Sequence, residues 1–277
     1  MSIRKKRIIK WGIAALCLLL LPFWLWTENN LITTQTVRVE LPCGELTVVH
    51  LSDLHTKTFG KDNEPLLSAV RDARPDVIVF TGDLVDAHRN SNVEPVMALL
   101  RTLCELAPTY VISGNHEYNS GRYTELMARY SEAGATVLVN SFDTLEIRGQ
   151  QIHIMGMDEG QPLDPDILAA FEALDGTRLL LSHYPENYTI NPKYNYAALD
   201  VDLILSGHAH GGQWILPLIG GVFAPGQGFN PKYYSGLYTE ENAPGLLVSR
   251  GLGNSVFPLR LFNRPHVVVL KSGAEEQ

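Results

Sequence analysis

The sequence predicts a mixed α/β sandwich that follows an N-terminal membrane anchor. Apolar runs typical of buried strands alternate with segments of helical period in the first half of the chain, and the second half is rich in strands. One uninterrupted apolar segment occupies residues 11–26. The composition, 45% hydrophobic and 19% charged over 277 residues, excludes a disordered tail, a coiled coil and a collagen-like fibre.

The segment 11–26 reads WGIAALCLLLLPFWLW and contains no charged residue. A helix of about 17–25 apolar residues crosses a bilayer, so this segment is just long enough when Ile8 and Ile9 extend it. It ends in an aromatic cluster that includes Trp24 and Trp26, which is typical of a membrane interface and not of a signal-peptide cleavage site. We therefore predict an uncleaved transmembrane helix, with a cleaved signal as the alternative.

Five basic residues and no acidic ones lie in the first 26 residues, all ahead of the apolar run. The positive-inside rule then makes residues 1–10 a basic cytoplasmic tail and sends the rest of the chain across the membrane. The sequence thus predicts a single-pass protein of the cell membrane whose folded domain is extracytoplasmic. The alternative is a monotopic anchor that enters one leaflet and returns, which Pro22 would permit.

The remaining 251 residues carry 17 Lys and Arg against 30 Asp and Glu. Such an acidic body repels polyanions, which argues against a nucleic-acid polymer as partner. A small phosphorylated substrate held by local metal charge is compatible with it. Cys43 and Cys104 could pair in an oxidising compartment, although two unrelated thiols are the simpler interpretation. The oligomeric state is open.

Residues 27–44 are predicted as a linker, polar over 27–36, and a first strand; residues 45–277 are predicted as one domain. The predicted buried strands cover 46–51, 77–80, 110–112, 136–139, 152–157, 179–181, 203–205, 246–248 and 267–270. The predicted helices cover 64–73, 93–106, 124–133 and 165–174. A segment rich in Gly and Pro over 217–236 forms either a substrate mouth or a surface loop.

Short clusters of metal-binding residue types follow five of these strands. They are SDLH at 52–55, GDLVD at 82–86, GNHE at 114–117, SH at 182–183 and SGHAH at 206–210. Open α/β sheets bind ligands just beyond the carboxyl ends of their strands. Five strand ends can therefore converge on one site.

The donors in these clusters are carboxylates, imidazoles and an amide oxygen, which suit Mn²⁺, Fe²⁺ or Zn²⁺; no thiolate favours a closed structural zinc site. Asp53 and His55 are two residues apart, so an extended backbone would place both side chains on one side and at one ion. The same step recurs at His208 and His210. The chain thus supplies donors for two ions, with Asp83 as the natural carboxylate to bridge them.

The succession D-x-H, G-D-x-x-D, G-N-H-E, a single His and G-H-x-H over residues 48–213 resembles the five-block signature of the calcineurin-like metallophosphoesterase superfamily. The stretches GHAHGGQWILPLIGGVFAPGQGF and SRGLGNSVFPLRLFNRP are similar to its membrane-anchored or exported bacterial phosphodiesterase branch. The resemblance implies a four-layer αββα sandwich with a two-metal site at its edge. Residues 45–277 would then be the metallophosphoesterase domain.

The resemblance also implies two divalent metal ions and a role for each block residue. Asp83 would bridge the ions. The other ligands would be Asp53, His55 and His210 for the first ion and Asn115, His183 and His208 for the second. His116 would hydrogen-bond the phosphate or protonate the leaving oxygen, and Asp86 would orient His116 as its partner carboxylate.

The predicted function is that of a phosphodiesterase, which hydrolyses a small or lipid-linked phosphodiester by metal-activated hydroxide. Ala87 stands where phosphatase relatives often have Arg, which removes a phosphate clamp and disfavours a protein phosphatase. Glu117 stands where Asp is common and is predicted to begin a helical turn, not to bind metal. The alternatives are a pyrophosphatase for a nucleotide-linked lipid precursor and a non-catalytic metal-binding module.

Overall fold

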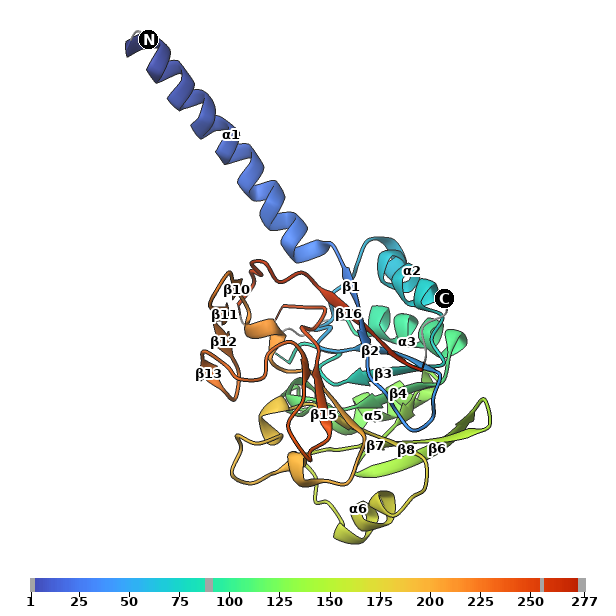
Figure 1. The fold of residues 1–277 in the computed structure, drawn as a ribbon. Coiled ribbons are helices and arrows are strands. Elements are labelled where there is room, and N and C mark those ends of the chain that lie inside the picture. Colours follow the sequence, from blue (N-terminus) through green and yellow to red (C-terminus); the bar gives the residue numbers. More distant parts are fainter. Residues whose placement is uncertain (1–2, 88–91, 255–256, 274–277) are drawn as a thin grey trace.

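The computed structural model describes residues 3–87, 92–254 and 257–273. In it, two six-stranded sheets pack against each other beneath a long N-terminal helix (Figure 1). The first sheet has the strand order β1 (Thr33–Arg38), β16 (His266–Ser272), β2 (Leu46–Leu51), β3 (Val77–Thr81), β4 (Thr109–Ile112) and β5 (Thr136–Val137). The strands β2 to β5 are parallel, and β16 runs antiparallel to β2.

The second sheet also contains four neighbouring parallel strands. Its order is β14 (Gly236–Tyr238), β15 (Gly245–Val248), β9 (Leu203–Ser206), β8 (Thr177–Ser182), β7 (Gln150–Gly156) and β6 (Ser141–Ile147). The four strands β15, β9, β8 and β7 are parallel, and antiparallel strands flank them on both sides. The two sheets cover each other on one face and helices cover the other face of each. The central strands are therefore buried on both faces, which is why most of them are apolar runs in the sequence.

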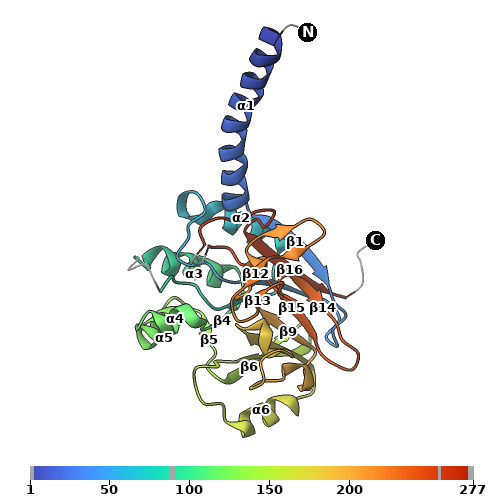
Figure 2. The same cartoon turned by 90° about the vertical axis from the view of Figure 1, so that its left-hand side faces the viewer.

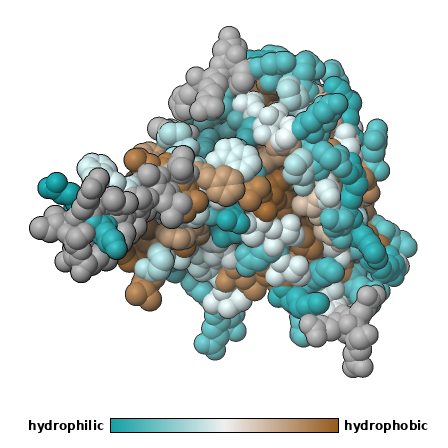
Figure 3. Space-filling view, turned by 90° about the horizontal axis from the view of Figure 1, so that it is seen from above, coloured by the Kyte–Doolittle hydropathy of each residue, from teal (hydrophilic) through white to brown (hydrophobic). Residues whose placement is uncertain are grey.

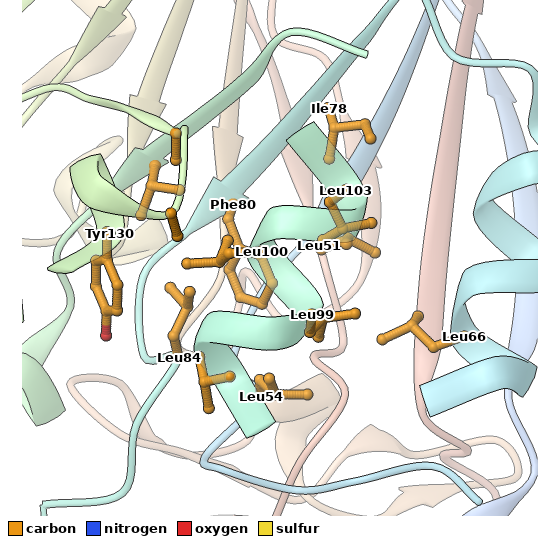
Figure 4. Packing of buried hydrophobic residues seen from close by; sticks show 14 of the residues in the cluster. Leu51, Leu54, Leu66, Ile78, Phe80, Leu84, Leu99, Leu100, Leu103 and Tyr130 are labelled. Atoms are coloured by element: carbon orange, nitrogen blue, oxygen red, sulfur yellow. The ribbon is translucent and has the colours of Figure 1, made fainter. Parts of the chain in front are cut away.

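Helices cover the outer faces of the two sheets. The helices α2 (Glu64–Ala73), α3 (Glu94–Leu106) and α5 (Tyr123–Glu132) pack on the first sheet, and α6 (Pro165–Glu172) packs on the second. Figure 4 shows Leu100 of α3 beside Phe80 of β3, and Leu66 of α2 facing the same core. The predicted four-layer αββα sandwich is confirmed for the described residues.

The alternation of side chains along each central strand divides the interior into separate cores. In β2, Val49 and Leu51 point towards the helices, whereas Val48 points into the core between the two sheets. Leu181 of β8 and Leu205 of β9 complete that inner core from the second sheet. All five side chains are fully buried, and each contributes about 1.5–3 kcal/mol to folding through its burial.

Shorter elements lie mainly around the edge of the sandwich. They are α4 (Asn115–Asn119), the 3₁₀ helices η1 (Lys61–Asn63), η2 (Pro185–Asn187), η3 (Tyr196–Ala198) and η4 (His210–Gly212), and the hairpin strands β10 (Ile215–Leu216), β11 (Gly220–Gly221), β12 (Phe223–Ala224) and β13 (Gly228–Phe229). The segment over 217–236, rich in Gly and Pro, contributes to these two hairpins. The sequence did not predict β6 or α4, because β6 is a partly exposed edge strand and α4 is a single short turn.

The helix α1 (Ile3–Asn30) projects from the body (Figures 1 and 2) and contains the predicted anchor over 11–26. Within the described part of the chain, no helix has a stretch that is both long enough and apolar enough to cross a membrane. The predicted transmembrane helix is therefore not confirmed. The helix continues beyond residue 26 because its last turn packs on the body, where Thr27 and Glu28 are buried.

Polar and aromatic contacts attach the end of α1 to the loop before β16. Glu28 accepts a hydrogen bond from Arg264 at 2.9 Å, and the Trp24 and Phe262 rings lie 5.3 Å apart. The Asn29 side chain accepts from the backbone N–H of Arg260 at 2.9 Å. The helix is thereby joined to a segment that also reaches the metal-binding residues described below.

Cys43 and Cys104 lie in different cores and both are free thiols. Cys43 is buried between the two sheets, whereas Cys104 lies on α3 outside the first sheet. The interpretation as two unrelated thiols is confirmed.

Candidate active site

The block residues converge at one edge of the sandwich, just beyond the ends of five parallel strands. The strands β2, β3 and β4 of the first sheet and β8 and β9 of the second all end here. Of the seven predicted ligands, six are buried and Asn115 is partly buried. The sheets thus bring together residues up to 157 positions apart in the chain, from Asp53 to His210.

One group of donors consists of Asp53, His55 and His210. The Nε2 atoms of His55 and His210 lie 3.1 Å apart, and Asp53 Oδ1 lies 3.7 Å from His210 Nε2. Asp53 is oriented by the backbone N–H of His208, which lies 3.0 and 3.2 Å from its two carboxylate oxygens. The group matches the first predicted ion site.

A second group consists of Asp83, His183 and His208. His183 Nε2 lies 3.3 Å from Asp83 Oδ2, 3.1 Å from His208 Nδ1 and 3.2 Å from Asn115 Oδ1. The opposite nitrogen of His183 faces the carbonyl oxygen of Thr81 at 2.7 Å, which fixes the orientation of the ring. The group matches the second predicted ion site.

Asp83 connects the two groups. Its Oδ2 lies 3.8 Å from His55 Nε2 in the first group and 3.3 Å from His183 Nε2 in the second. Its Oδ1 accepts a hydrogen bond from the backbone N–H of His116 at 2.8 Å. One oxygen is thus held by the protein backbone while the other faces both groups, as the sequence predicts for a bridging carboxylate.

The donor geometry fits divalent metal ions. Ligand atoms bound at about 2.1 Å in tetrahedral or octahedral geometry lie about 3.0–3.4 Å apart. The N···N separations of 3.1 Å in the His55–His210 and His183–His208 pairs fall in this range. Oxygen and nitrogen donors without thiolate suit Mn, Fe or Zn. The residues of both groups could therefore hold metal ions.

Burial and mutual charge set the protonation of these groups. Burial lowers the pKa of His55 to about 4 and of His208 to about 3, and it lowers the pKa of His210 well below its usual value. These rings are neutral near pH 7, so their lone pairs are free for a metal. Burial opposes ionisation of Asp83, but the charge and hydrogen bond of His183, together with the charges of His55 and His116, hold the pKa of Asp83 well below its usual range.

The ligand-bearing segments have an unusual backbone. Asp53, His55, Asp83, His208 and His210 all have positive φ, between 47° and 63°. The expectation that an extended strand aligns Asp53 with His55 is therefore wrong: β2 ends at Leu51, and left-handed turns direct both side chains inwards. Non-glycine residues rarely adopt this conformation, and such strain is typical of functional sites.

Two glycines allow the close approach of the two groups. A Cβ at Gly114 would lie 2.3 Å from Asp83 Oδ1, and a Cβ at Gly82 would lie 2.7 Å from His183 Nδ1. Gly82 also has φ of +88°, which side chains disfavour. Both positions require glycine if Asp83 and His183 are to keep their places.

His116 lies at the start of α4 and stacks edge-on against His55, with ring centroids 4.4 Å apart. Its Nδ1 accepts a hydrogen bond from the backbone N–H of Ala87 at 2.9 Å, and Asp86 Oδ1 lies 3.6 Å from the same nitrogen. Because Nδ1 is an acceptor, the neutral ring carries its proton on Nε2. The predicted pair of His116 and Asp86 is thus assembled beside the donor groups.

Glu117 is outside the donor groups, as predicted. It is fully buried, and its carboxylate accepts from the backbone N–H groups of Asp83, Leu84 and Gly114 at 2.8–3.0 Å and from Tyr130 Oη at 3.1 Å. The side chain therefore holds the loop that carries Asp83 against the start of α4.

The sequence reasoning missed two residues that touch the ligands. Glu186 Oε1 lies 3.8 Å from His208 Nε2, and burial raises the pKa of Glu186 to about 7. Arg260, which is fully buried, reaches His210 Nδ1 with Nη2 at 3.4 Å. Proximity to His183 in the sequence could have indicated Glu186. Arg260 lies 50 residues from His210, and the signal that could have indicated it is its place in the stretch SRGLGNSVFPLRLFNRP.

Four histidines lie outside the five blocks of the sequence, and their positions predict structural roles: His50, His88, His153 and His266. His50 pairs with Thr81 at 2.8 Å, and His153 and His266 are also buried and hydrogen-bonded. These three predictions are confirmed. His88 lies outside the described residues.

The family profile of the calcineurin-like phosphoesterases matches residues 46–212, more than half of the chain. The chain belongs to this family. It is 33% identical to the metallophosphoesterase YkuE of Bacillus subtilis over 80% of this chain and 77% of that protein. It is 32% identical to the phosphodiesterase YaeI of Escherichia coli over 81% of both chains.

Membership of the calcineurin-like phosphoesterase family agrees with the site. The protein is a hydrolase of phosphoric ester bonds whose donor groups suit divalent metals. The profile spans the predicted residues from Asp53 to His210 and includes both donor groups. The alternative of a non-catalytic metal-binding module is therefore set aside.

Proposed function

We propose that the protein is a phosphodiesterase that hydrolyses a small or lipid-linked phosphodiester. The observation that carries the diester preference is Ala87, which lies directly beside His116. Its methyl side chain brings no positive charge to a position where an arginine would bind the second negative charge of a monoester. The likeness to the phosphodiesterase YaeI supports the same preference.

The chain would bind two divalent ions. Asp53, His55 and His210 would hold one ion and Asn115, His183 and His208 the other, with Asp83 shared between them. When bound, such ions lower the pKa of a coordinated water and stabilise the attacking and leaving oxygens of the ester. Mn, Fe and Zn are all compatible with these donors.

The protein's own contribution at the leaving group is His116. Its Nδ1 is occupied by the Ala87 N–H, so the proton on Nε2 is available for the departing oxygen. Asp86, 3.6 Å from Nδ1, would stabilise the positive charge when the ring is fully protonated. Asp86 therefore acts through His116 as a positioning residue.

A paired assay tests the proposal. The full chain is given p-nitrophenyl phosphate, its bis-ester and a nucleoside diphosphate ester, with Mn²⁺, Zn²⁺, Fe²⁺ or Mg²⁺ and after chelation. We expect metal-dependent cleavage of the bis-ester at a higher kcat/KM than the monoester. Preference for the monoester would overturn the diester proposal, and preference for the nucleoside diphosphate ester would support the pyrophosphatase instead.

We also propose that α1 places the protein at the cell membrane with its catalytic domain on the extracytoplasmic side. Lys5 and Lys10 are exposed at one end of the helix, and Phe23 and Trp26 are more than half exposed near the other. Basic residues favour the cytoplasmic side, and aromatic residues favour the interface. Alkaline phosphatase fused after residue 277 should be active in intact cells; an inactive fusion together with a fluorescent green-fluorescent-protein fusion would reverse the orientation.

A further inference from the structure

A cavity of about 590 Å³ lies directly beside the first donor group. His210 belongs both to that group and to the cavity wall. The wall is otherwise mostly apolar, and its aromatic members are Trp214, Phe223, Phe229 and Phe257. Its volume lies within the range of about 300–1,000 Å³ that is typical of small-molecule sites.

The side-chain nitrogen donors of Gln213 and Trp214 already have partners. Gln213 donates its amide hydrogens to the carbonyl oxygens of Phe257 and Leu259, both at 2.9 Å, and Trp214 Nε1 donates to Leu259 at 3.0 Å. A polar ligand would find few free donors here and would lose its hydration without replacement. The cavity therefore favours an apolar occupant.

The rim of the cavity exposes large apolar side chains. Phe229 is 80% exposed, Phe257 48% and Phe223 44%, and the rings form the pairs Phe223–Phe229 and Trp214–Phe257 with centroids 5.4 and 5.3 Å apart. Seen from the side on which α1 leaves the body, apolar side chains gather among hydrophilic ones (Figure 3). An apolar ligand would remove this surface from water.

A second cavity, of about 380 Å³, lies beside the other donor group and has more polar walls. Asn115, which lies 3.2 Å from His183, is part of its wall. Around it are polar and charged side chains such as Glu159, Asn187 and Lys193. The two donor groups are thus associated with cavities of contrasting polarity.

We propose that the apolar cavity binds a hydrocarbon chain of the substrate. The proposal rests on the proposed phosphodiesterase function and makes the substrate amphiphilic. The phosphodiester would lie at the donor groups, the hydrocarbon chain on the His210 side and the polar group on the Asn115 side. The occupant must be part of the substrate because His210 is common to the cavity wall and the donor group.

A series of substrates of increasing chain length tests this proposal. The full chain with Mn²⁺ is assayed on methyl, butyl and octyl p-nitrophenyl phosphodiesters below their micelle concentrations. Burial of one methylene changes affinity by up to about fourfold, so we expect kcat/KM to rise at least about tenfold from methyl to octyl. An equal kcat/KM for all three esters would overturn the proposal.

Two variants test whether the dependence of kcat/KM on alkyl chain length arises in this cavity. Val222→Trp fills the cavity, and Phe229→Asp places a charge on its exposed rim. Both should abolish the dependence on chain length, so that the octyl ester reacts with the kcat/KM of the methyl ester. The matched control is Leu218→Asp, at a fully exposed apolar residue of the neighbouring hairpin outside the cavity wall, which should keep the dependence. If both cavity variants retained the dependence on chain length, the hydrocarbon chain of the substrate would bind elsewhere and the proposal would be wrong.

A binding measurement separates this proposal from the proposed function. Failure to hydrolyse any of the esters would contradict the phosphodiesterase function alone. Calorimetric titration of octyl phosphate and methyl phosphate then tests the cavity directly. We expect octyl phosphate to bind at least about tenfold more tightly, and Val222→Trp to remove the difference; equal binding of both compounds by the unmodified chain would overturn the cavity assignment.

Discussion

At the residue scale, the histidines of the site use their ring nitrogens differently, although His116 lies with His55 and Asp83 in a third possible donor group. The Nε2 atoms of His55 and His210 face each other, whereas Nδ1 of His116 is occupied by a backbone N–H. A backbone donor cannot rotate away, so it fixes the tautomer of His116. The placement of the proton on Nε2 of His116 therefore depends on the backbone N–H of Ala87 and not on the Ala87 side chain.

His116→Ala should reduce kcat by about 10²–10⁴-fold, because it removes the proton donor but no predicted metal ligand. Metal content, measured by mass spectrometry after desalting, should stay at the level of the unmodified protein. His153→Ala, which replaces a buried histidine far from the donor groups, is a control for general effects on folding. Loss of bound metal in His116→Ala would show that His116 is a ligand.

Arg260→Met should destabilise the protein by about 3 kcal/mol or more. The fully buried guanidinium donates to backbone carbonyls of Arg250, Gly253 and Asn263, and each acceptor would be left without this partner. Since Arg260 also contacts His210, metal affinity should fall in the same variant.

Arg264→Met is the matched control for Arg260→Met, because Arg264 is partly exposed and pairs with a carboxylate, that of the buried Glu28. It should cost less than Arg260→Met, because it removes one such contact in place of several buried ones. Urea unfolding and metal titration of both variants give the comparison. Equal costs would mean that the buried contacts of Arg260 contribute little to stability.

At the element scale, the site depends on turns that leave the strands abruptly. The strands β2, β3 and β9 end one or two residues before Asp53, Asp83 and His208, respectively, and these three residues have left-handed backbones. The sheets supply a rigid edge, and the turns direct the side chains inwards. Glu117 ties the β3 turn to α4, so the positions of Asp83 and His116 are set together.

Gly114→Ala tests this coupling between β4 and the turn after β3. The residue has φ of −124°, which alanine adopts easily, so the effect comes from its Cβ, which would lie 2.3 Å from Asp83 Oδ1. Displacement of Asp83 should weaken metal binding about 10–100-fold, as changes around metal ligands do. Metal titration of the purified variant measures it.

Gly121→Ala is the control for Gly114→Ala. A Cβ at Gly121 has no atom within 4 Å, but φ of +68° makes alanine cost about 1 kcal/mol. This variant should lose stability and keep its metal affinity. If Gly114→Ala also kept its metal affinity, the close approach to Asp83 would not matter.

At the scale of the whole molecule, many buried neutral histidines make stability depend on pH. Burial lowers the pKa of His50 and His208 to about 3 and of His55 to about 4, against about 6.5 in the unfolded chain. Between these values the unfolded state binds more protons, so stability falls as pH falls. Burial opposes protonation of His183, but Asp83 raises its pKa to about 10, so its contribution to stability is complete below about pH 6.5 and is lost as pH rises from there to about 10.

In the metal-free protein each such histidine should therefore contribute a loss of about 2 kcal/mol of unfolding free energy between pH 7 and pH 5. Urea unfolding of chelated protein at several pH values measures the change. Metal-saturated protein should lose even more, because protons compete with metal for the same imidazoles. Asp53, Glu117 and Glu186 oppose this loss, because burial raises their pKa values to about 6, 7 and 7 and they bind protons in the folded state over the same range. The contribution of one ring is therefore measured by comparison with His50→Gln, and an unchanged pH dependence in that variant would contradict the burial of His50 as a neutral group.

The sequence by itself determined the order of the main strands and helices and the chemistry of the site. Continuous apolar runs such as 77–80 and 203–205 predict strands buried on both faces, and polar donors directly after them predict a site at one sheet edge. Asp53, Asp83, His183 and His210 were therefore identified without coordinates. Carboxylate and imidazole side chains are metal ligands by their residue type, so the sequence alone predicts metal binding.

Only the tertiary structure decided how those residues meet. The left-handed turn at Asp53, the Ala87 amide at His116, and the contact of Arg260 with His210 all depend on segments distant in sequence or on single φ angles. Neither hydrophobic periodicity nor residue spacing carries that information. The apolar cavity beside His210 is decided in the same way, because its walls come from two loops that meet only in the folded protein.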